Sequence, residues 1–271
     1  MTQARLLPLL AAPAAGVLVL FFGLPLLVLT LEALGEGGAA FGRLFADGVF
    51  WRGLRGSLVL GTVAPGCSLV MGFLVALYLA RKPVELRTAL LFLISLPLTF
   101  SGLIIAYGFI LAFGRAGFVT LLLAEIGFDP ASVGGFIYSP AGLGFAYSYY
   151  LIPRVVLVLM PVLVNFDRAQ LLAAESLGAG RLRTLLEVLL PQIVPACVAA
   201  YCLVAAVAIG AYGTALALVG TQVNILPLLL YSKISETGSD FPAAAALSIV
   251  LMAICTLVMA LAEVFVAARK A

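Results

Sequence analysis

The sequence predicts an all-α, polytopic membrane protein with six transmembrane helices, and three observations lead to this prediction. Of the 271 residues, 64% are apolar and only 10% are charged. The mean hydropathy of +1.23 is far too high for a chain that covers itself with a charged, water-facing surface. Six long apolar stretches follow one another along the chain. We therefore expect residues 1–271 to form a single transmembrane domain.

The first predicted span covers residues 9–31. It follows Arg5, and the apolar stretch from Leu6 to Leu34 is too long for the core of a cleaved signal peptide, so we expect a retained helix. The other spans are expected at 57–80, 89–113, 141–164, 193–219 and 242–267. A smaller outer helix is expected at 118–126. Each span is long enough to cross a hydrocarbon layer of about 30 Å.

The distribution of basic residues predicts the side of the membrane. If the N-terminus is cytoplasmic, the outer segments hold Arg43, Arg52, Arg55, Arg115 and Lys233. The inner segments then hold a larger set, which comprises Arg5, Arg81, Lys82, Arg87, Arg168, Arg181, Arg183, Arg269 and Lys270. Because cytoplasmic loops are enriched in lysine and arginine, this asymmetry favours cytoplasmic N- and C-termini.

The residue inventory argues against an enzyme and predicts neither a catalytic nor a metal site. Histidine is absent, which removes His-ligated metals and Ser-His-Asp chemistry. The four cysteines have no metal-ligand spacing, and no HExxH, GxSxG or GxxxxGK[ST] motif occurs. No basic run with interleaved aromatic residues is present, so we expect no nucleic-acid partner.

The inner connection between the fourth and fifth spans, residues 165–191, is the most informative segment. It reads NFDRAQLLAAESLGAGRLRTLLEVLLP. Its first part has apolar residues at helical spacing, Gly178 can adopt the left-handed conformation that ends a helix, and Arg181 starts a second helix. Crossing a bilayer does not require such a hairpin. A surface that binds another protein and responds to its movement does require a rigid element of this kind, because a helix can transmit force.

This segment resembles the EAA loop of permease subunits in ATP-binding-cassette importers, which reads Glu-Ala-Ala, three residues, Gly and a spacer that ends in Leu-Pro. The matching residues are Ala173, Ala174, Gly178, Leu190 and Pro191, with Asp167 before them and six spans around them. The chain resembles the type I branch, and its layout is similar to permeases for polyamines, sulfate, thiamine, iron and phosphonate. One position departs from the pattern, because Leu172 stands where glutamate is usual. An acid appears at Glu175, one turn away, and whether it replaces that glutamate is left open.

The resemblance implies a mechanism and a set of partners. The short helix from Arg168 to Leu177 would dock on a dimer of cytoplasmic ATPase subunits, which would bind the ATP and Mg²⁺, so this chain would bind no cofactor itself. A second permease subunit, identical or related, and an extracytoplasmic solute-binding protein would complete the assembly. The implied location is the bacterial cytoplasmic (inner) membrane, in contact with its lipids.

Arg154, which lies near the middle of the fourth span, is a candidate residue of the translocation path. In one interpretation this arginine lines the path and favours an anionic solute. In the other it pairs with a carbonyl freed by Pro153 or extends towards an interface. Three tyrosines at similar depths are further candidates for a polar constriction: Tyr107, Tyr150 and Tyr212.

An alternative function is that of a secondary transporter or channel that works without ATP. Such a protein would need coupling-ion carboxylates inside its spans or an inverted repeat. Glu263 is the only acid that could be placed in lipid, and no repeat is visible. The ATP-driven permease is therefore the leading hypothesis.

Overall fold

The computed structural model describes residues 13–220, 222–235 and 240–268, and within these ranges the chain is helical and has no strand. Residues 9–12 of the first predicted span lie outside the described residues, as do Arg5, Arg269 and Lys270. Six described helices are long and apolar enough to cross a membrane: Pro13–Leu34, Gly48–Leu79, Gly102–Glu125, Pro140–Val164, Arg181–Ile209 and Phe241–Ala268. The predicted all-α class with six membrane helices is confirmed.

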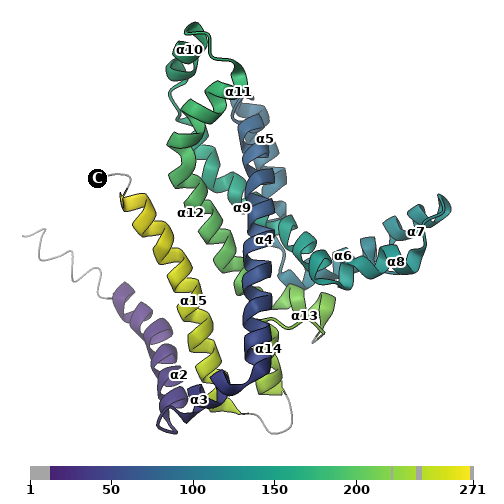
Figure 1. The fold of residues 1–271 in the computed structure, drawn as a ribbon, viewed down its shortest axis with the longest axis vertical. Coiled ribbons are helices and arrows are strands. Elements are labelled where there is room, and N and C mark those ends of the chain that lie inside the picture. Colours follow the sequence, from purple (N-terminus) through teal and green to yellow (C-terminus); the bar gives the residue numbers. More distant parts are fainter. Residues whose placement is uncertain (1–12, 221, 236–239, 269–271) are drawn as a thin grey trace, which may run out of the picture.

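The core of the bundle is built around α9 (Pro140–Val164), which packs against α4 (Gly48–Leu79) and α12 (Leu190–Ile209) (Figure 1). Leu143, Leu151 and Leu159 of α9 are completely buried. Because Gly72 has no side chain, α4 approaches α9 closely: a Cβ atom at Gly72 would lie 2.6 Å from Val155 Cγ1. The helix that carries Arg154 is thus the most enclosed element of the bundle.

The helix of the second span begins at Gly48, well before the predicted position 57. Asp47 caps it, since its carboxylate accepts a hydrogen bond of 2.8 Å from Val49 N. The preceding segment is also helical, as α3 (Ala39–Ala46), and Phe50 is 1% exposed. The segment between the first two spans is therefore a helical corner that Phe50 and Leu44 pack against the bundle, while Phe45 and Trp51 remain about half exposed.

A second layer consists of α15 (Phe241–Ala268) and the first span. The first span includes a π-helical turn, η1 (Val19–Gly23), and ends in α2 (Leu24–Leu34), which packs on α15. Among the residues of this span that the structure describes, nearly all apolar side chains are exposed, as expected of a helix that faces lipid. An exposed ion pair between Arg43 and Asp240 joins α3 to the start of α15.

The third predicted span, 89–113, is not one helix. It consists of α5 (Val84–Ser95), a 3₁₀ turn η2 (Leu96–Thr99) and α6 (Gly102–Phe113), separated by extended backbone at Phe100 and Ser101. Pro97 lacks an N–H, and the Ser101 hydroxyl caps α6 by accepting a hydrogen bond from Ile104 N, so the helix stops and restarts here.

After this break the chain leaves the bundle as an arm (Figure 1). The arm comprises α6, α7 (Phe118–Glu125), α8 (Pro130–Gly135) and the 3₁₀ turn η3 (Phe136–Tyr138). The helix predicted at 118–126 corresponds to α7.

The fifth predicted span, 193–219, is also interrupted. Helix α12 ends at Ile209, and α13 (Gly213–Val219) begins after a break at 210–212. Beyond α13, the connection to α15 contains α14 (Leu226–Ser235), which packs on α4 and α15. The two interruptions correct the prediction of continuous helices at 89–113 and 193–219, because hydropathy measures apolar content and does not detect where a helix stops.

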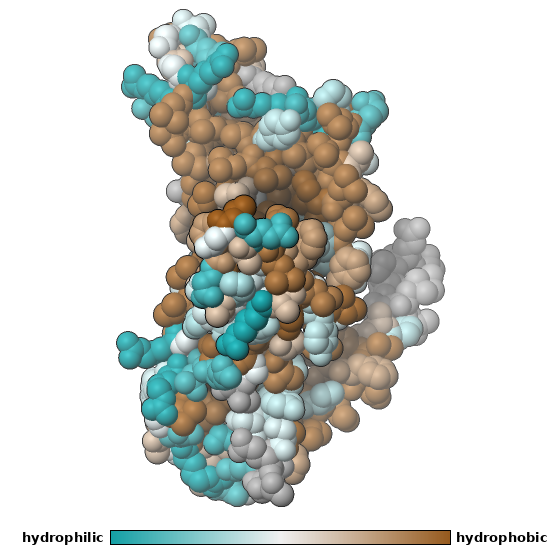
Figure 2. Space-filling model, turned by 90° about the vertical axis from the view of Figure 1, so that its right-hand side faces the viewer, coloured by the Kyte–Doolittle hydropathy of each residue, from teal (hydrophilic) through white to brown (hydrophobic). Residues whose placement is uncertain are grey.

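The surface is divided in the way that a bilayer requires. Figure 2 shows apolar side chains over much of one face, with polar side chains gathered towards both ends and a smaller polar group where the arm points at the viewer. Such a distribution matches an apolar belt between two headgroup regions.

Candidate functional site

The segment 165–191 forms a helical hairpin at one tip of the molecule (Figure 1). Helix α10 (Arg168–Ser176) is capped by Asp167, whose carboxylate accepts a hydrogen bond of 2.9 Å from Ala169 N. Gly178 has φ +86°, which is the left-handed conformation that ends the helix. The chain then continues through α11 (Arg181–Thr184) and a π-helical turn, η4 (Leu185–Leu189), into α12, which Leu190 and Pro191 open.

Two leucines on this hairpin are unusually exposed. Leu172, in the position where the resembled motif has glutamate, is 66% exposed, and Leu177 is 88% exposed. Ala173 and Glu175 are exposed beside them, and Ala174 is half-buried. Within the described part of the chain Glu175 forms no ion pair, so it anchors the loop to no described residue of this chain. The apolar groups are left free to contact another molecule.

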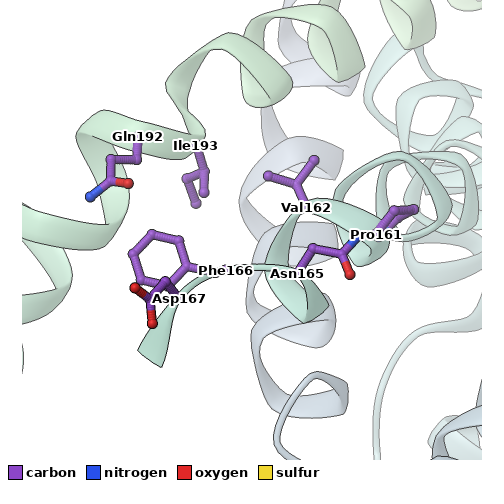
Figure 3. A pocket seen from close by; sticks show the side chains of 7 residues that line it. All are labelled: Pro161, Val162, Asn165, Phe166, Asp167, Gln192 and Ile193. Carbon is purple, nitrogen blue, oxygen red and sulfur yellow. The ribbon is translucent and has the colours of Figure 1, made fainter. Parts of the chain in front are cut away.

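A cavity of about 410 Å³ lies where the hairpin meets the bundle (Figure 3). Asp167 and Phe166 lie on one side of it, and Gln192 and Ile193 of α12 lie on another. The side-chain amide of Gln192 donates a hydrogen bond of 2.6 Å to the Gln170 side-chain oxygen, which ties α10 to α12. The hairpin is therefore fixed to the membrane helix that follows it.

A second cavity, of about 310 Å³, lies inside the bundle where both interrupted spans meet α9. Three of the four path candidates line it: Tyr150, Arg154 and Tyr212. The fourth, Tyr107, is 56% exposed on α6 and does not line it. The remaining lining residues come from both breaks and their flanks: Pro97, Leu98, Phe100, Gly102, Ile105, Val207, Gly210, Ala211, Gly213 and Thr214.

Hydrogen bonds hold the two breaks together. The Thr214 hydroxyl donates to Gly102 O at 3.1 Å, which joins the start of α13 to the start of α6. Glycine is required at 102, because an added Cβ would lie 2.5 Å from Thr214 Oγ1. The Tyr147 hydroxyl donates to Ala211 O at 2.8 Å and so satisfies a carbonyl that the break of the fifth span leaves free.

Arg154 is half-buried, and its Nη1 donates a hydrogen bond of 2.8 Å to Tyr150 O. Its guanidinium lies 5.4 Å from the centroid of the Tyr150 ring, a cation–π contact. Pro153 frees the carbonyl of Tyr149, four residues before it, so Arg154 is not paired with the freed carbonyl. Among the described residues no carboxylate pairs with Arg154. A cation at this depth costs about 3 kcal/mol, and these contacts offset only part of that cost.

A third cavity, of about 940 Å³, was not foreseen from the sequence. It opens between α4, the start of α9 and residues 222–225, and Arg55, Gln222 and Asn224 supply polar groups to a largely apolar wall. The signal that could have indicated it is the Gly56-Ser57 pair. A Cβ at Gly56 would lie 2.1 Å from Asn224 O, and Ser57 Oγ accepts a hydrogen bond of 2.8 Å from Leu226 N.

Several known proteins are similar to this chain in sequence or in fold. PotB, the spermidine/putrescine transport system permease protein of Escherichia coli, is 28% identical over 91% of this chain and 91% of its own length. CysW, the sulfate transport system permease protein of Synechocystis, is 26% identical over 93% of this chain and 90% of its own. A chain in a crystal structure of a bacterial alginate ABC transporter superposes with a TM-score of 0.76 at 20% identity, over 96% of this chain and 93% of that one.

The family model described as "binding-protein-dependent transport system inner membrane component" matches residues 68–270. This range includes the hairpin, both breaks and Arg154. The type I permease resemblance inferred from the EAA-like segment is thereby confirmed. The chain belongs to the family of binding-protein-dependent transport system inner membrane components.

Proposed function

We propose that this chain is the permease subunit of an ATP-binding-cassette importer and that a cytoplasmic ATPase binds it at α10. The observation that carries the proposal is the exposure of Leu172 and Leu177 on a capped, rigid helix at the tip of the molecule. Apolar groups that are left uncovered on an ordered, otherwise polar helix are typical of a protein-binding surface. The cavity that contains Arg154 then belongs to the translocation path.

The assembly contains two permease subunits, two ATPase subunits and an extracytoplasmic solute-binding protein. The ATPase subunits hold ATP and Mg²⁺, and their closure moves α10 together with α12, to which Gln170 and Gln192 tie it. The second permease is a copy of this chain or a relative. The family description and the periplasmic protein named with the alginate transporter support the binding protein as a partner.

The chain lies in the bacterial inner membrane with both termini in the cytoplasm. Arg81 and Lys82 lie between α4 and α5 and Arg87 lies in the first turn of α5, at the same end as α10, and Arg181 and Arg183 lie on α11 (Figure 1). Helix α15 runs towards that end (Figure 1). Lysine and arginine concentrated at the α10 end support its assignment to the cytoplasm.

Co-purification of the permease with its proposed ATPase partner tests the proposal. Leu177→Asp combined with Leu172→Asp places two charges on the proposed contact, so we expect the ATPase to be lost from the purified complex and ATP-driven uptake to stop. Val84→Asp is the matched control, because Val84 is 60% exposed on α5 at the same end of the molecule. Retention of the ATPase by the double variant would overturn the proposal.

A further inference from the structure

We propose that the cavity at the junction of the two interrupted spans is a binding site for an oxyanion, such as sulfate, phosphate or a carboxylate group. This inference rests on the proposed permease function, since the occupant is the solute in transit. Three kinds of hydrogen-bond donor belong to residues that line this cavity: a guanidinium, a tyrosine hydroxyl and the backbone amide at the start of a helix.

The first donor is Arg154. A guanidinium has five N–H groups, and one hydrogen bond, to Tyr150 O, is observed among the described residues. The side chain lines the cavity and has no carboxylate partner in the described chain. An uncompensated cation inside a bilayer attracts an anion and repels a cation, so its charge determines which solutes can rest here.

The second donor is the Tyr150 hydroxyl, a separate group at the far end of the ring that Arg154 contacts. Tyr150 is 6% exposed and lines the cavity, and its hydroxyl has no hydrogen-bond partner among the described residues. The Thr214 hydroxyl lies nearby and donates its own proton to Gly102 O, so it leaves the proton of the Tyr150 hydroxyl available for a ligand. A buried hydroxyl without a partner is rare in folded proteins, and a ligand in the cavity would satisfy it.

The third donor is the amide of Gly102, the first residue of the 12-residue helix α6. The first amides of a helix have no partner within it, and the helix dipole favours negative charge at that end. Gly102 also lines the cavity, and it is held there by Thr214. Interruption of the span therefore turns a helix start towards the same space as Arg154.

The names of the related proteins include solutes of positive charge and solutes of negative charge. Spermidine is a cation, whereas sulfate and the acidic polysaccharide alginate are anions. Sequence identity does not decide between them, since the PotB and CysW relatives are 28% and 26% identical. The positive charge of Arg154 favours the anion, because a guanidinium repels an ammonium group and, like the Gly102 amide N–H, cannot accept a hydrogen bond from it.

Binding of labelled sulfate, phosphate and succinate to the purified full chain in lipid-free detergent tests the inference, with spermidine as the cationic probe. At least one anion should bind at millimolar concentration. Arg154→Gln should weaken that binding by about tenfold or more and Tyr150→Phe by about threefold, while Arg154→Lys retains part of it. Arg115→Gln is the matched control, since Arg115 is exposed on the arm beside Tyr138.

Three outcomes would overturn the inference. They are the absence of binding by all three anions, equal binding by a monodisperse Arg154→Gln variant, and preferential binding of spermidine. A lipid headgroup carries the same chemistry, so displacement of the anion by phosphatidylglycerol would overturn the assignment to a solute. No ATPase is present in this experiment. A negative result in this binding experiment would therefore leave the proposed ATPase contact at α10 standing. A negative result in the ATPase co-purification experiment would likewise leave the anion-binding result unchanged.

Discussion

The Tyr147 hydroxyl and the Ala211 carbonyl oxygen are joined by a hydrogen bond of 2.8 Å that links the middle of α9 to the break between α12 and α13. Tyr147 is fully buried, and its hydroxyl holds the Ala211 carbonyl at the wall of the cavity that Ala211 lines. The cavity beside it therefore has one wall whose shape depends on a single side chain 64 residues away in sequence.

Removal of this hydroxyl should destabilise the break. Tyr147→Phe leaves Ala211 O without its donor, which should cost about 0.5–2 kcal/mol. The temperature at which half of the protein is lost from the monodisperse chromatographic peak should fall. Tyr149→Phe is the control, since Tyr149 is 44% exposed and should tolerate the same change. An equal effect of the two substitutions would contradict this account.

Two serines of α4 should respond in opposite ways to alanine. Ser57 Oγ accepts a hydrogen bond from the buried Leu226 N, so Ser57→Ala should cost about 1–2 kcal/mol. Ser68 Oγ is buried with no partner among the described residues, so Ser68→Ala should be neutral or stabilising. The same thermal measurement compares them, and the prediction fails if Ser68→Ala is the more damaging change.

Two glycines of α4 should also differ in their response to alanine substitution. A Cβ at Gly72 would meet Val155 at 2.6 Å, so Gly72→Ala should push α4 from α9 and cost about 1–3 kcal/mol. Gly66 has nothing within 4 Å, so Gly66→Ala should gain about 0.5–1 kcal/mol from reduced backbone freedom in the unfolded chain. Equal melting temperatures would show that the close approach of the two helices is not required.

Gly178 should matter for coupling more than for folding. Its φ of +86° is unfavourable for other residues by about 1–2 kcal/mol, so Gly178→Ala should loosen the turn between α10 and α11. Uptake per ATP hydrolysed by the reconstituted importer should fall, and the thermal stability of the permease should fall only slightly, because the turn is exposed at the tip of the molecule and can relax locally. Gly180, with φ −69° and open space around it, gives the control Gly180→Ala. Normal uptake by Gly178→Ala would refute the requirement for this turn.

The fold class was predictable because a helix that crosses a lipid bilayer needs a long apolar segment, and the hydropathy of the sequence shows directly where such segments lie. Interruptions were not predictable in the same way. At Ser101-Gly102 and Gly210–Tyr212 the apolar content continues across the break, and only the local signals of proline, glycine and a capping serine mark it. Asp47 likewise extends α4 beyond the apolar run, through a cap that hydropathy does not register.

The candidate site was predictable where the chemistry is local. The hairpin 165–191 follows from helical spacing, and the cost of a buried charge draws attention to Arg154. Tyr150 is one helical turn before Arg154 on α9, but what brings Tyr212 and Gly102 to Arg154 is the meeting of helices from distant parts of the chain, which no single segment encodes. Tyr107 illustrates the limit, since a tyrosine at a similar depth can equally face outwards, as it does here.

The uninterrupted helical run from Arg181 to Ile209 connects the hairpin directly to the break beside Arg154. Its 29 residues form a rod of roughly 40 Å. Because a rod pivots as a unit, a small angular change imposed at its hairpin end would become a lateral displacement of several ångströms at the other end. In the proposed importer, a movement of the hairpin would then reach the break without a relay of side chains, and the π-helical turn at Leu185–Leu189 is an irregularity within that rod.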